Sequence, residues 1–146
     1  MLEALQFIAT LSAALFAGAA VYINLVEHPA RMSCGTEVAA TVWAPSYKRA
    51  TVLQVPLAIA STLAGSASWV LGGGSLWLVG SLLIFSVVPF TLAAIMPTNA
   101  RLLAPGRDLA AAETRALLER WARLHGVRSA LGLAATIAYL ASLLRT

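Results

Sequence analysis

The sequence predicts an all-α protein, a four-helix bundle that is integral to a membrane, and three observations support this fold class. The chain has 146 residues, of which 60% are hydrophobic and only 11% are charged. A soluble domain usually carries about 25% charged residues, so this chain has too few charges to cover a water-soluble globule. The mean hydropathy is +0.81. Finally, four apolar stretches are each long enough to cross a bilayer, and nearly all basic residues lie between them.

The four apolar stretches cover roughly residues 2–26, 50–71, 76–96 and 125–144. A helix of about 20 residues, at a rise of about 1.5 Å per residue, crosses a hydrocarbon core of about 30 Å. Gly72-Gly73-Gly74-Ser75 separates the second stretch from the third. Glycine permits the positive φ values of a tight reversal, so a short turn is predicted there. We expect one domain over residues 1–146.

The basic residues predict the orientation of the chain in the membrane. With four spans, the connectors after the first and third spans share a face. They hold nine of the ten Lys and Arg residues: Arg31, Lys48, Arg49, Arg101, Arg107, Arg115, Arg120, Arg123 and Arg128. The opposite face has Arg145. The positive-inside rule therefore predicts cytoplasmic connectors and both termini outside. The net charge of +4 is thus a topology signal, and no nucleic acid is expected as a partner.

The second connector contains an amphipathic helical pattern. Asp108 is a suitable N-cap for a segment from Leu109 onward. Apolar side chains alternate with charged ones at helical spacing over residues 113–124. Two interpretations remain open: an amphipathic helix on the cytoplasmic surface, or a cytoplasmic extension that is continuous with the fourth span.

Polar residues near the connector ends of the spans form stripes at helical spacing. The stripes are Asn24, His28 and Arg31; Tyr47, Thr51 and Gln54; and Trp121, His125, Arg128 and Gly132. Glu27, Trp43 and Thr98-Asn99 lie beside them. A polar group in lipid is costly without a partner, so these faces should turn toward one another. We therefore expect a polar pocket at the cytoplasmic mouth of the bundle.

A short internal sequence repeat suggests two duplicated hairpins. Trp43 and Tyr47 stand four residues apart, as do Trp121 and His125, and each pair precedes a basic residue and a span. This pattern is compatible with two copies of one helical hairpin, related by an axis along the membrane normal.

The polar residues have both structural and chemical interpretations. Histidine and tryptophan are common at membrane interfaces, and Glu27 is suited to an ion pair with Arg31 or Arg128. Histidine can also act as a general base, oriented by a neighbouring carboxylate, while Arg128 could stabilise an oxyanion. His28, His125 and Glu27 together could bind a transition metal (copper, iron or zinc), although no HxxxH or ExxH spacing supports it. The single cysteine, Cys34, excludes an intramolecular disulfide and a CxxC pair.

Several motifs together resemble a known family. They are Ala17-Gly18-Ala19, Glu27-His28-Pro29, Trp43-x-Pro45-x-Tyr47, Pro97-Thr98-Asn99 and Trp121-x-x-Leu124-His125-x-x-Arg128. In this order, across four spans, they resemble the anthrone oxygenase-like family of small bacterial and fungal membrane proteins, so a bacterial inner membrane is the expected location. The resemblance implies an oxygenase that converts an anthrone into an anthraquinone with molecular oxygen, without flavin or haem.

The resemblance also implies roles for the pocket residues. His125 would be the base, Arg128 and Asn99 would stabilise the oxyanion, and His28 with Glu27 would form a second acid/base pair. Trp43, Tyr47 and Trp121 would line an aromatic slot for the substrate, together with Gln54 and Asn24.

Two classes of function remain open from the sequence. One is a membrane oxidoreductase, a monooxygenase acting on a lipophilic phenol, anthrone or quinol. The other is a non-enzymatic membrane protein that binds a metal or small molecule, or packs as a subunit against a partner. The expected partners are the lipid bilayer and a lipophilic small molecule, and self-association into a homo-oligomer is left open.

Overall fold

The computed structural model describes residues 1–145, and these residues form helices without strands. The elements are α1 (Leu2–Tyr22), the π-helical turn η1 (Ile23–Glu27), α2 (His28–Ser33), α3 (Thr36–Ser68), η2 (Trp69–Gly73), α4 (Ser75–Phe90), η3 (Thr91–Ile95), α5 (Met96–Leu102) and α6 (Ala112–Leu143). They join into four long rods, Leu2–Ser33, Thr36–Gly73, Ser75–Leu102 and Ala112–Leu143, each long and apolar enough to cross a membrane. The predicted fold class is therefore confirmed.

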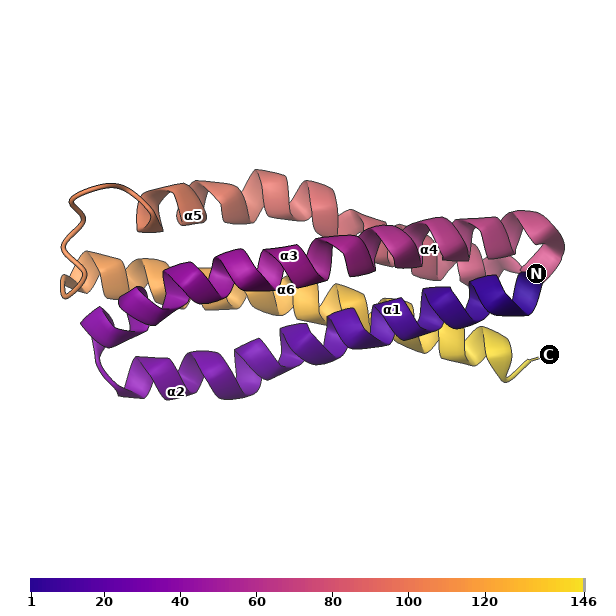
Figure 1. Ribbon diagram of the computed structural model, residues 1–146, viewed down its shortest axis with the longest axis horizontal. Coiled ribbons are helices and arrows are strands. Elements are labelled where there is room, and N and C mark those ends of the chain that lie inside the picture. Colours follow the sequence, from indigo (N-terminus) through magenta and orange to yellow (C-terminus); the bar gives the residue numbers. More distant parts are fainter. Residues whose placement is uncertain (146) are drawn as a thin grey trace.

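The two ends of the bundle carry different features (Figure 1). Both chain ends lie at one end of the bundle, with the glycine turn between η2 and α4. The turn from α2 to α3 and the loop from α5 to α6 lie at the other. We call these the termini end and the connector end. The predicted glycine turn is present, since Gly72 and Gly74 have φ values of 88° and 95°.

The rods at the connector end extend beyond the apolar stretches of the sequence. The second rod begins at Thr36 rather than near residue 50, and Pro45 lies inside α3 rather than in a connector. The amphipathic segment is continuous with the fourth span, so the extension interpretation fits and a separate surface helix does not. The helix starts at Ala112, later than the expected Leu109, because Asp108 Oδ1 accepts a hydrogen bond from Ala110 N within the preceding loop.

Two π-helical turns accommodate prolines in the first and third rods. Pro29 is the sixth residue after Ile23, where η1 begins, and Pro97 is the sixth after Thr91, where η3 begins. Proline lacks an N–H and clashes with the carbonyl four residues earlier, so a widened turn lets each rod continue. The first rods of the two hairpins thus share a π-turn and a proline at the same spacing, which favours the duplicated-hairpin interpretation.

The core at the termini end is tightly packed around Tyr139. Its ring stacks on Trp77, with centroids 5.0 Å apart, and lies where a Cβ at Gly80 would overlap it. The hydroxyl donates to Ser61 O at 3.2 Å and lies 3.1 Å from Ser81 Oγ. Glycine and serine here let the helix backbones approach closely, which is how helices associate in lipid.

Candidate functional site

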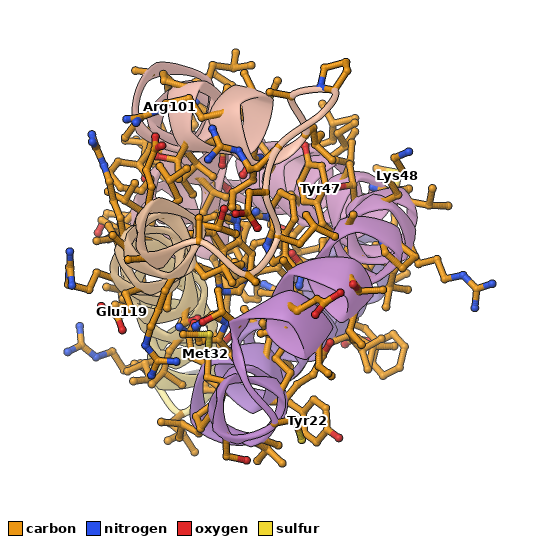
Figure 2. All side chains as sticks on the ribbon, turned by 90° about the vertical axis from the view of Figure 1, so that its left-hand side faces the viewer. Tyr22, Met32, Tyr47, Lys48, Arg101 and Glu119 are labelled. Atoms are coloured by element: carbon orange, nitrogen blue, oxygen red, sulfur yellow. The ribbon has the colours of Figure 1, made fainter. Side chains whose placement is uncertain are left out.

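The polar stripes meet inside the connector end of the bundle. His28 is 5% exposed and His125 is 2% exposed, so both imidazoles are buried rather than turned toward the membrane surface. Figure 2, viewed from the connector end, shows Lys48 and Glu119 pointing outward and Tyr47 lying between the helices. These polar residues therefore lie inside the bundle, between the helices.

The amide of Asn24, in η1, fixes the orientation of His125 in α6. Asn24 Nδ2 donates to Ala122 O at 2.9 Å, which directs Oδ1 toward His125. Oδ1 lies 2.7 Å from His125 Nδ1 and also accepts a 2.6 Å hydrogen bond from Ser129 Oγ. An amide oxygen only accepts, so the proton of this bond belongs to Nδ1. In the neutral ring, Nε2 of His125 then carries a lone pair.

His28 has the opposite tautomer, because a cation donates to it. Arg31 places Nε at 3.2 Å and Nη2 at 3.0 Å from His28 Nδ1. Guanidinium groups only donate, so Nδ1 accepts and the proton of the neutral ring is on Nε2. Arg31 Nη1 also pairs with Glu27 at 3.2 Å, and Ser46 donates to the same carboxylate oxygen. The expected ion pair of Glu27 is therefore with Arg31, and the groups that orient the histidines are Asn24 and Arg31 rather than a carboxylate.

Trp121 connects these groups by ring contacts. Its indole stacks on His125 with centroids 4.7 Å apart, and the His28 ring is tilted at 5.6 Å. Arg31 Cζ lies 5.3 Å from the same ring, within the range of a cation–π contact. Trp43 meets Trp121 edge-on at 5.8 Å.

The aromatic slot expected from the sequence is filled by its own rings. Trp43 and Tyr47 stack almost parallel, at 5.2 Å and 3°, and both Trp43 and Trp121 are buried in the core of the connector end. Trp43 is therefore a packing residue here. Tyr47 alone of the three lines the large cavity described next.

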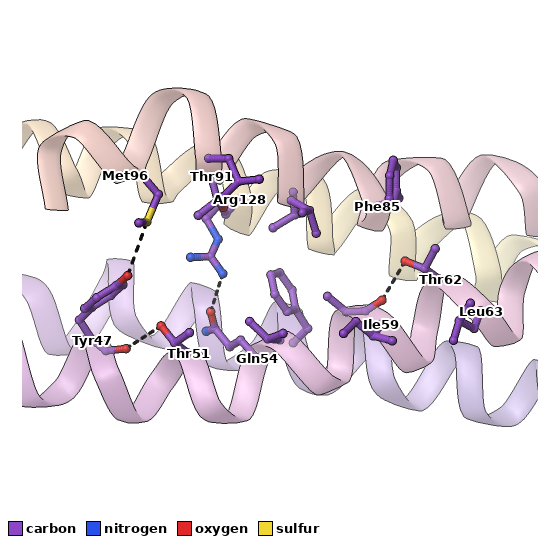
Figure 3. A pocket seen from close by; sticks show the side chains of 16 residues that line it. Tyr47, Thr51, Gln54, Ile59, Thr62, Leu63, Phe85, Thr91, Met96 and Arg128 are labelled. Atoms are coloured by element: carbon purple, nitrogen blue, oxygen red, sulfur yellow. Dashed lines mark hydrogen bonds between the residues drawn. The ribbon is translucent and has the colours of Figure 1, made fainter. Parts of the chain in front are cut away.

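A groove of about 490 Å³ opens sideways between α3 and the rod formed by α4, η3 and α5 (Figure 3). We call it the lateral groove. Its floor is buried, whereas rim residues such as Leu63 and Leu92 are 66% and 63% exposed. Volumes of about 300–1,000 Å³ are typical of small-molecule sites. It is lined by Phe16, Tyr47, Thr51, Gln54, Val55, Ala58, Ile59, Thr62, Leu63, Phe85, Val87, Val88, Thr91, Leu92, Met96 and Arg128.

The polar groups of the lateral groove gather at one part of it. Arg128 reaches across from α6, and its Nη2 donates to Gln54 Oε1 at 2.9 Å (Figure 3). Gln54 Nε2, Arg128 Nε and Thr91 Oγ1 are buried and find no hydrogen-bond partner within residues 1–145. Two of these atoms are N–H donors. A buried donor without an acceptor costs free energy, so this part of the groove is suited to a ligand oxygen.

A small polar recess adjoins the groove and reaches His125. Its volume is about 10 Å³, close to the space of one water molecule. It shares Tyr47, Thr51, Gln54 and Arg128 with the groove, and Ile23, Arg31, Ser46, Ala50, Trp121 and His125 complete its walls. The base candidate thus lies next to the ligand-sized cavity.

The structure does not bring Asn99 to Arg128, as the oxyanion role would require. Asn99 is buried in α5, where its amide approaches Met96 Sδ at 3.9 Å, and other described residues form the groove and recess. The metal interpretation also lacks a ligand set, because no three His, Cys, Asp or Glu residues within 1–145 come close enough to hold one ion.

Four site residues had no catalytic or substrate-binding role in the sequence analysis: Arg31, which appeared there only in a polar stripe and as an ion-pair partner of Glu27, and Ser46, Ser129 and Thr91. Arg31 follows Glu27 by four residues and His28 by three, and Ser129 follows His125 by four. These spacings place each pair on one helix face and were a usable signal. Thr91 and Ser46 had no comparable signal, because their positions depend on how neighbouring rods are placed.

The fold and site define a class: a small four-helix membrane protein with a buried histidine pair and a ligand-sized groove open to the side. A family model described as anthrone oxygenase matches residues 43–138, and the chain belongs to this family. The match begins at Trp43 and includes Tyr47, Gln54, Trp121, His125 and Arg128. No curated protein and no solved structure matched the chain.

Proposed function

We propose that this protein is a membrane-embedded oxygenase that oxidises a lipophilic phenol of the anthrone or quinol type with molecular oxygen. The family suggests an oxygenase-like reaction. The observation that carries the proposal is the recess beside the groove: His125, whose Nε2 carries the lone pair, lines it together with Gln54 and Arg128, which both have unpartnered donors. A base beside oxyanion donors is what abstraction of a proton α to an enolisable carbonyl requires.

The proposed reaction balances with O₂ as the only oxidant. His125 Nε2 removes one proton from the benzylic CH₂, and the electron pair delocalises onto the ring oxygen as an enolate. The carbanion carbon then reduces O₂ and bonds to it, and the peroxide takes up a proton. Loss of the second C–H proton and cleavage of the O–O bond release water and leave a carbonyl. One oxygen atom enters the product and the other enters water.

The roles of the other residues follow from their positions. Arg128 and Gln54 stabilise the enolate oxygen, because both residues line the groove and each has a buried N–H without a partner within residues 1–145. Asn24 holds His125 in the reactive tautomer rather than contacting substrate. His28 and Glu27 act through Arg31, which lines the recess while bonding to both.

The test is oxygen consumption by the purified protein in lipid nanodiscs with an anthrone as substrate. We expect His125→Ala to lower the rate about 10²- to 10⁴-fold, the usual contribution of a general base, with an unchanged helical content. Leu53→Ala, on an exposed face of α3, is the control and should retain full activity. With ¹⁸O₂, one labelled atom should appear in the quinone.

Two results would lead to other conclusions. Full activity of His125→Ala would remove this histidine from the reaction. Binding of an anthraquinone without any oxygen consumption by the wild-type protein would favour the non-enzymatic alternative, a membrane protein that binds a small molecule.

The proposed orientation places the connector end, and therefore the recess, on the cytoplasmic side, as the positive-inside rule predicts. A reporter that is active only in the periplasm should be active when fused to the C-terminus. Activity of a cytoplasm-only reporter at that position would reverse the orientation.

A further inference from the structure

We propose that the lateral groove takes its ligand directly from the bilayer, as a flat fused-ring molecule lying along α3 with its oxygen at Gln54, and that residues near Thr62 limit its length. This inference rests on the proposed function for the identity of the ring system, but it concerns binding and access rather than oxidation.

The rim of the groove has the composition of a surface in contact with lipid. Ile59 and Leu63 on α3 face Phe85, Val88 and Leu92 across the opening, and all five are apolar and exposed. An aqueous ligand site would leave this much apolar rim in water, whereas lipid solvates it without cost. The opening therefore faces the hydrocarbon region.

A side-chain contact spans the connector end of the groove. Tyr47 Oη reaches Met96 Sδ at 3.8 Å, so α3 and α5 are bridged there (Figure 3). Behind Tyr47 lies the stacked and buried Trp43, and beyond it Glu27 is engaged by Ser46 and Arg31. A ligand that arrived from the aqueous side would have to break these contacts, whereas the lateral opening requires none to break.

The unpartnered donors of Gln54 and Arg128 indicate where in the groove the oxygen of the ligand should lie. Gln54 is 2% exposed, yet its Nε2 has no partner within residues 1–145. A lipid acyl chain in the groove would leave this donor and Arg128 Nε unsatisfied, at a cost for each. A ligand with a carbonyl or phenolate oxygen at one end satisfies them, and its rings then contact Phe16, Ala58 and Phe85.

The length limit comes from the spacing along α3. Gln54 and Thr62 are eight residues apart, which is about 12 Å along a helix. Thr62 and Phe85 line the groove at the part away from Tyr47 and Met96 (Figure 3). A bulky side chain at Thr62 should therefore shorten the space for the rings while leaving the oxygen site at Gln54 intact.

The binding test uses the full chain in nanodiscs and 1,8-dihydroxyanthraquinone, which cannot undergo the oxidation, with equilibrium binding as the readout. Ile59→Trp and Val88→Trp should weaken binding about tenfold or more, because the new ring occupies the ligand's volume. Leu53→Trp, which adds the same ring on an exposed face outside the groove, should bind like the wild type. Equal binding by all three variants would overturn the proposal.

Two further experiments test separately the length limit at Thr62 and the route by which the ligand enters the groove. Thr62→Trp should no longer bind the three-ring probe but should still bind a two-ring hydroxynaphthoquinone. If this variant binds both probes like the wild type, the proposed length limit is wrong. At a fixed aqueous concentration of free probe, the association rate should rise when the lipid composition is changed so that more probe partitions into the bilayer. An association rate that follows the aqueous concentration alone would assign access to the aqueous side.

A last variant tests whether the groove binds a ligand through its oxygen or only holds lipid acyl chains. Gln54→Leu should weaken the anthraquinone probe about tenfold, whereas insensitivity to this change would mean that the groove holds acyl chains and would overturn the proposal. Because no turnover is measured, a protein that binds as expected but oxidises nothing would refute the proposed function and leave this inference standing.

Discussion

The termini end and the connector end of the bundle are built from the same four rods but differ in how closely these rods pack. At the termini end, Gly65 and Gly80 allow α3 and α4 to close around Tyr139, and its hydroxyl is satisfied by Ser61 and Ser81. At the connector end, α3 parts from η3 and α5, and large polar side chains occupy the interior.

Close packing at the termini end stabilises the bundle, and the candidate site lies at the connector end. In lipid, close backbone packing rather than the hydrophobic effect holds helices together, and the glycine-rich end provides it. The other end can then keep a cavity and unpartnered donors, which are unfavourable for stability by themselves. Substitutions at the two ends should therefore have opposite signatures: loss of stability at one, loss of rate or binding at the other.

Among the substitutions that compare the two ends, Arg128→Leu should have the largest effect, and on rate and binding rather than on stability. Removal of one oxyanion donor commonly costs about 10²- to 10³-fold in rate, and Arg128 lines the groove with its Nε unpartnered within residues 1–145. Arg128→Lys keeps the charge but not the planar fork, so its rate should be intermediate. Oxygen consumption in nanodiscs measures both. Equal rates for the wild type and Arg128→Leu would contradict the assignment.

Gly80→Ala should have the largest effect on stability. The added Cβ overlaps the Tyr139 ring, and overpacking typically costs about 1–3 kcal/mol. Gly18→Ala is the matched control, since a Cβ there meets nothing within 4 Å, and it should not lower stability because alanine is the better helix former. Reversible unfolding in detergent is the measurement. Similar stability of the two variants would show that this end is not the rigid one.

Asn24→Leu should lower the rate about 10- to 100-fold, the range observed when a group that orients a histidine is removed. The direct readout is the ¹⁵N spectrum of labelled histidine: His125 should be the Nδ1–H tautomer in the wild type and lose this preference in the variant. Ser129→Ala should change less, because Asn24 keeps its bonds to His125 and to Ala122 O. An Nε2–H tautomer in the wild type would refute the proposed role of His125.

Tyr139→Phe should have the smallest effect, a loss of about 1 kcal/mol in unfolding free energy, the net worth of a typical hydrogen bond. Ser81 keeps its own bond to Trp77 O, so the variant leaves little unsatisfied. Thermal unfolding gives the stability, and the oxidation rate of the remaining folded protein should equal that of the wild type. A large rate change would mean that the two ends are coupled.

Much of the architecture was predictable because lipid imposes simple rules. Apolar runs of spanning length marked the four rods, and the glycine run marked the turn at Gly72. The burial of His28 and His125 followed from the cost of polar groups in lipid. Extension of α3 back to Thr36 was missed, because residues 36–49 are not apolar enough to count as a span.

The site was only partly predictable. Stripes at helical spacing placed Asn24, His125, Gln54 and Arg128 in the interior, but spacing does not tell which side chain bonds to which. Asn24 therefore looked like a substrate contact rather than the partner of His125. The groove itself depends on how far α3 and η3 stand apart, a property of packing between rods that no periodicity within one rod encodes.

The polar recess adjoins the groove at the connector end, and this determines how the proposed ligand is oriented in the membrane. The groove runs from Tyr47 toward Leu63 on α3 and does not continue to the glycine turn at Gly72, where the rods are closed. In the proposed binding mode, the oxygen of the ligand therefore lies in the half of the bilayer beside the connectors, and its rings extend toward the midplane. Molecules whose polar end lies at the opposite membrane surface must turn over before they can bind in this orientation.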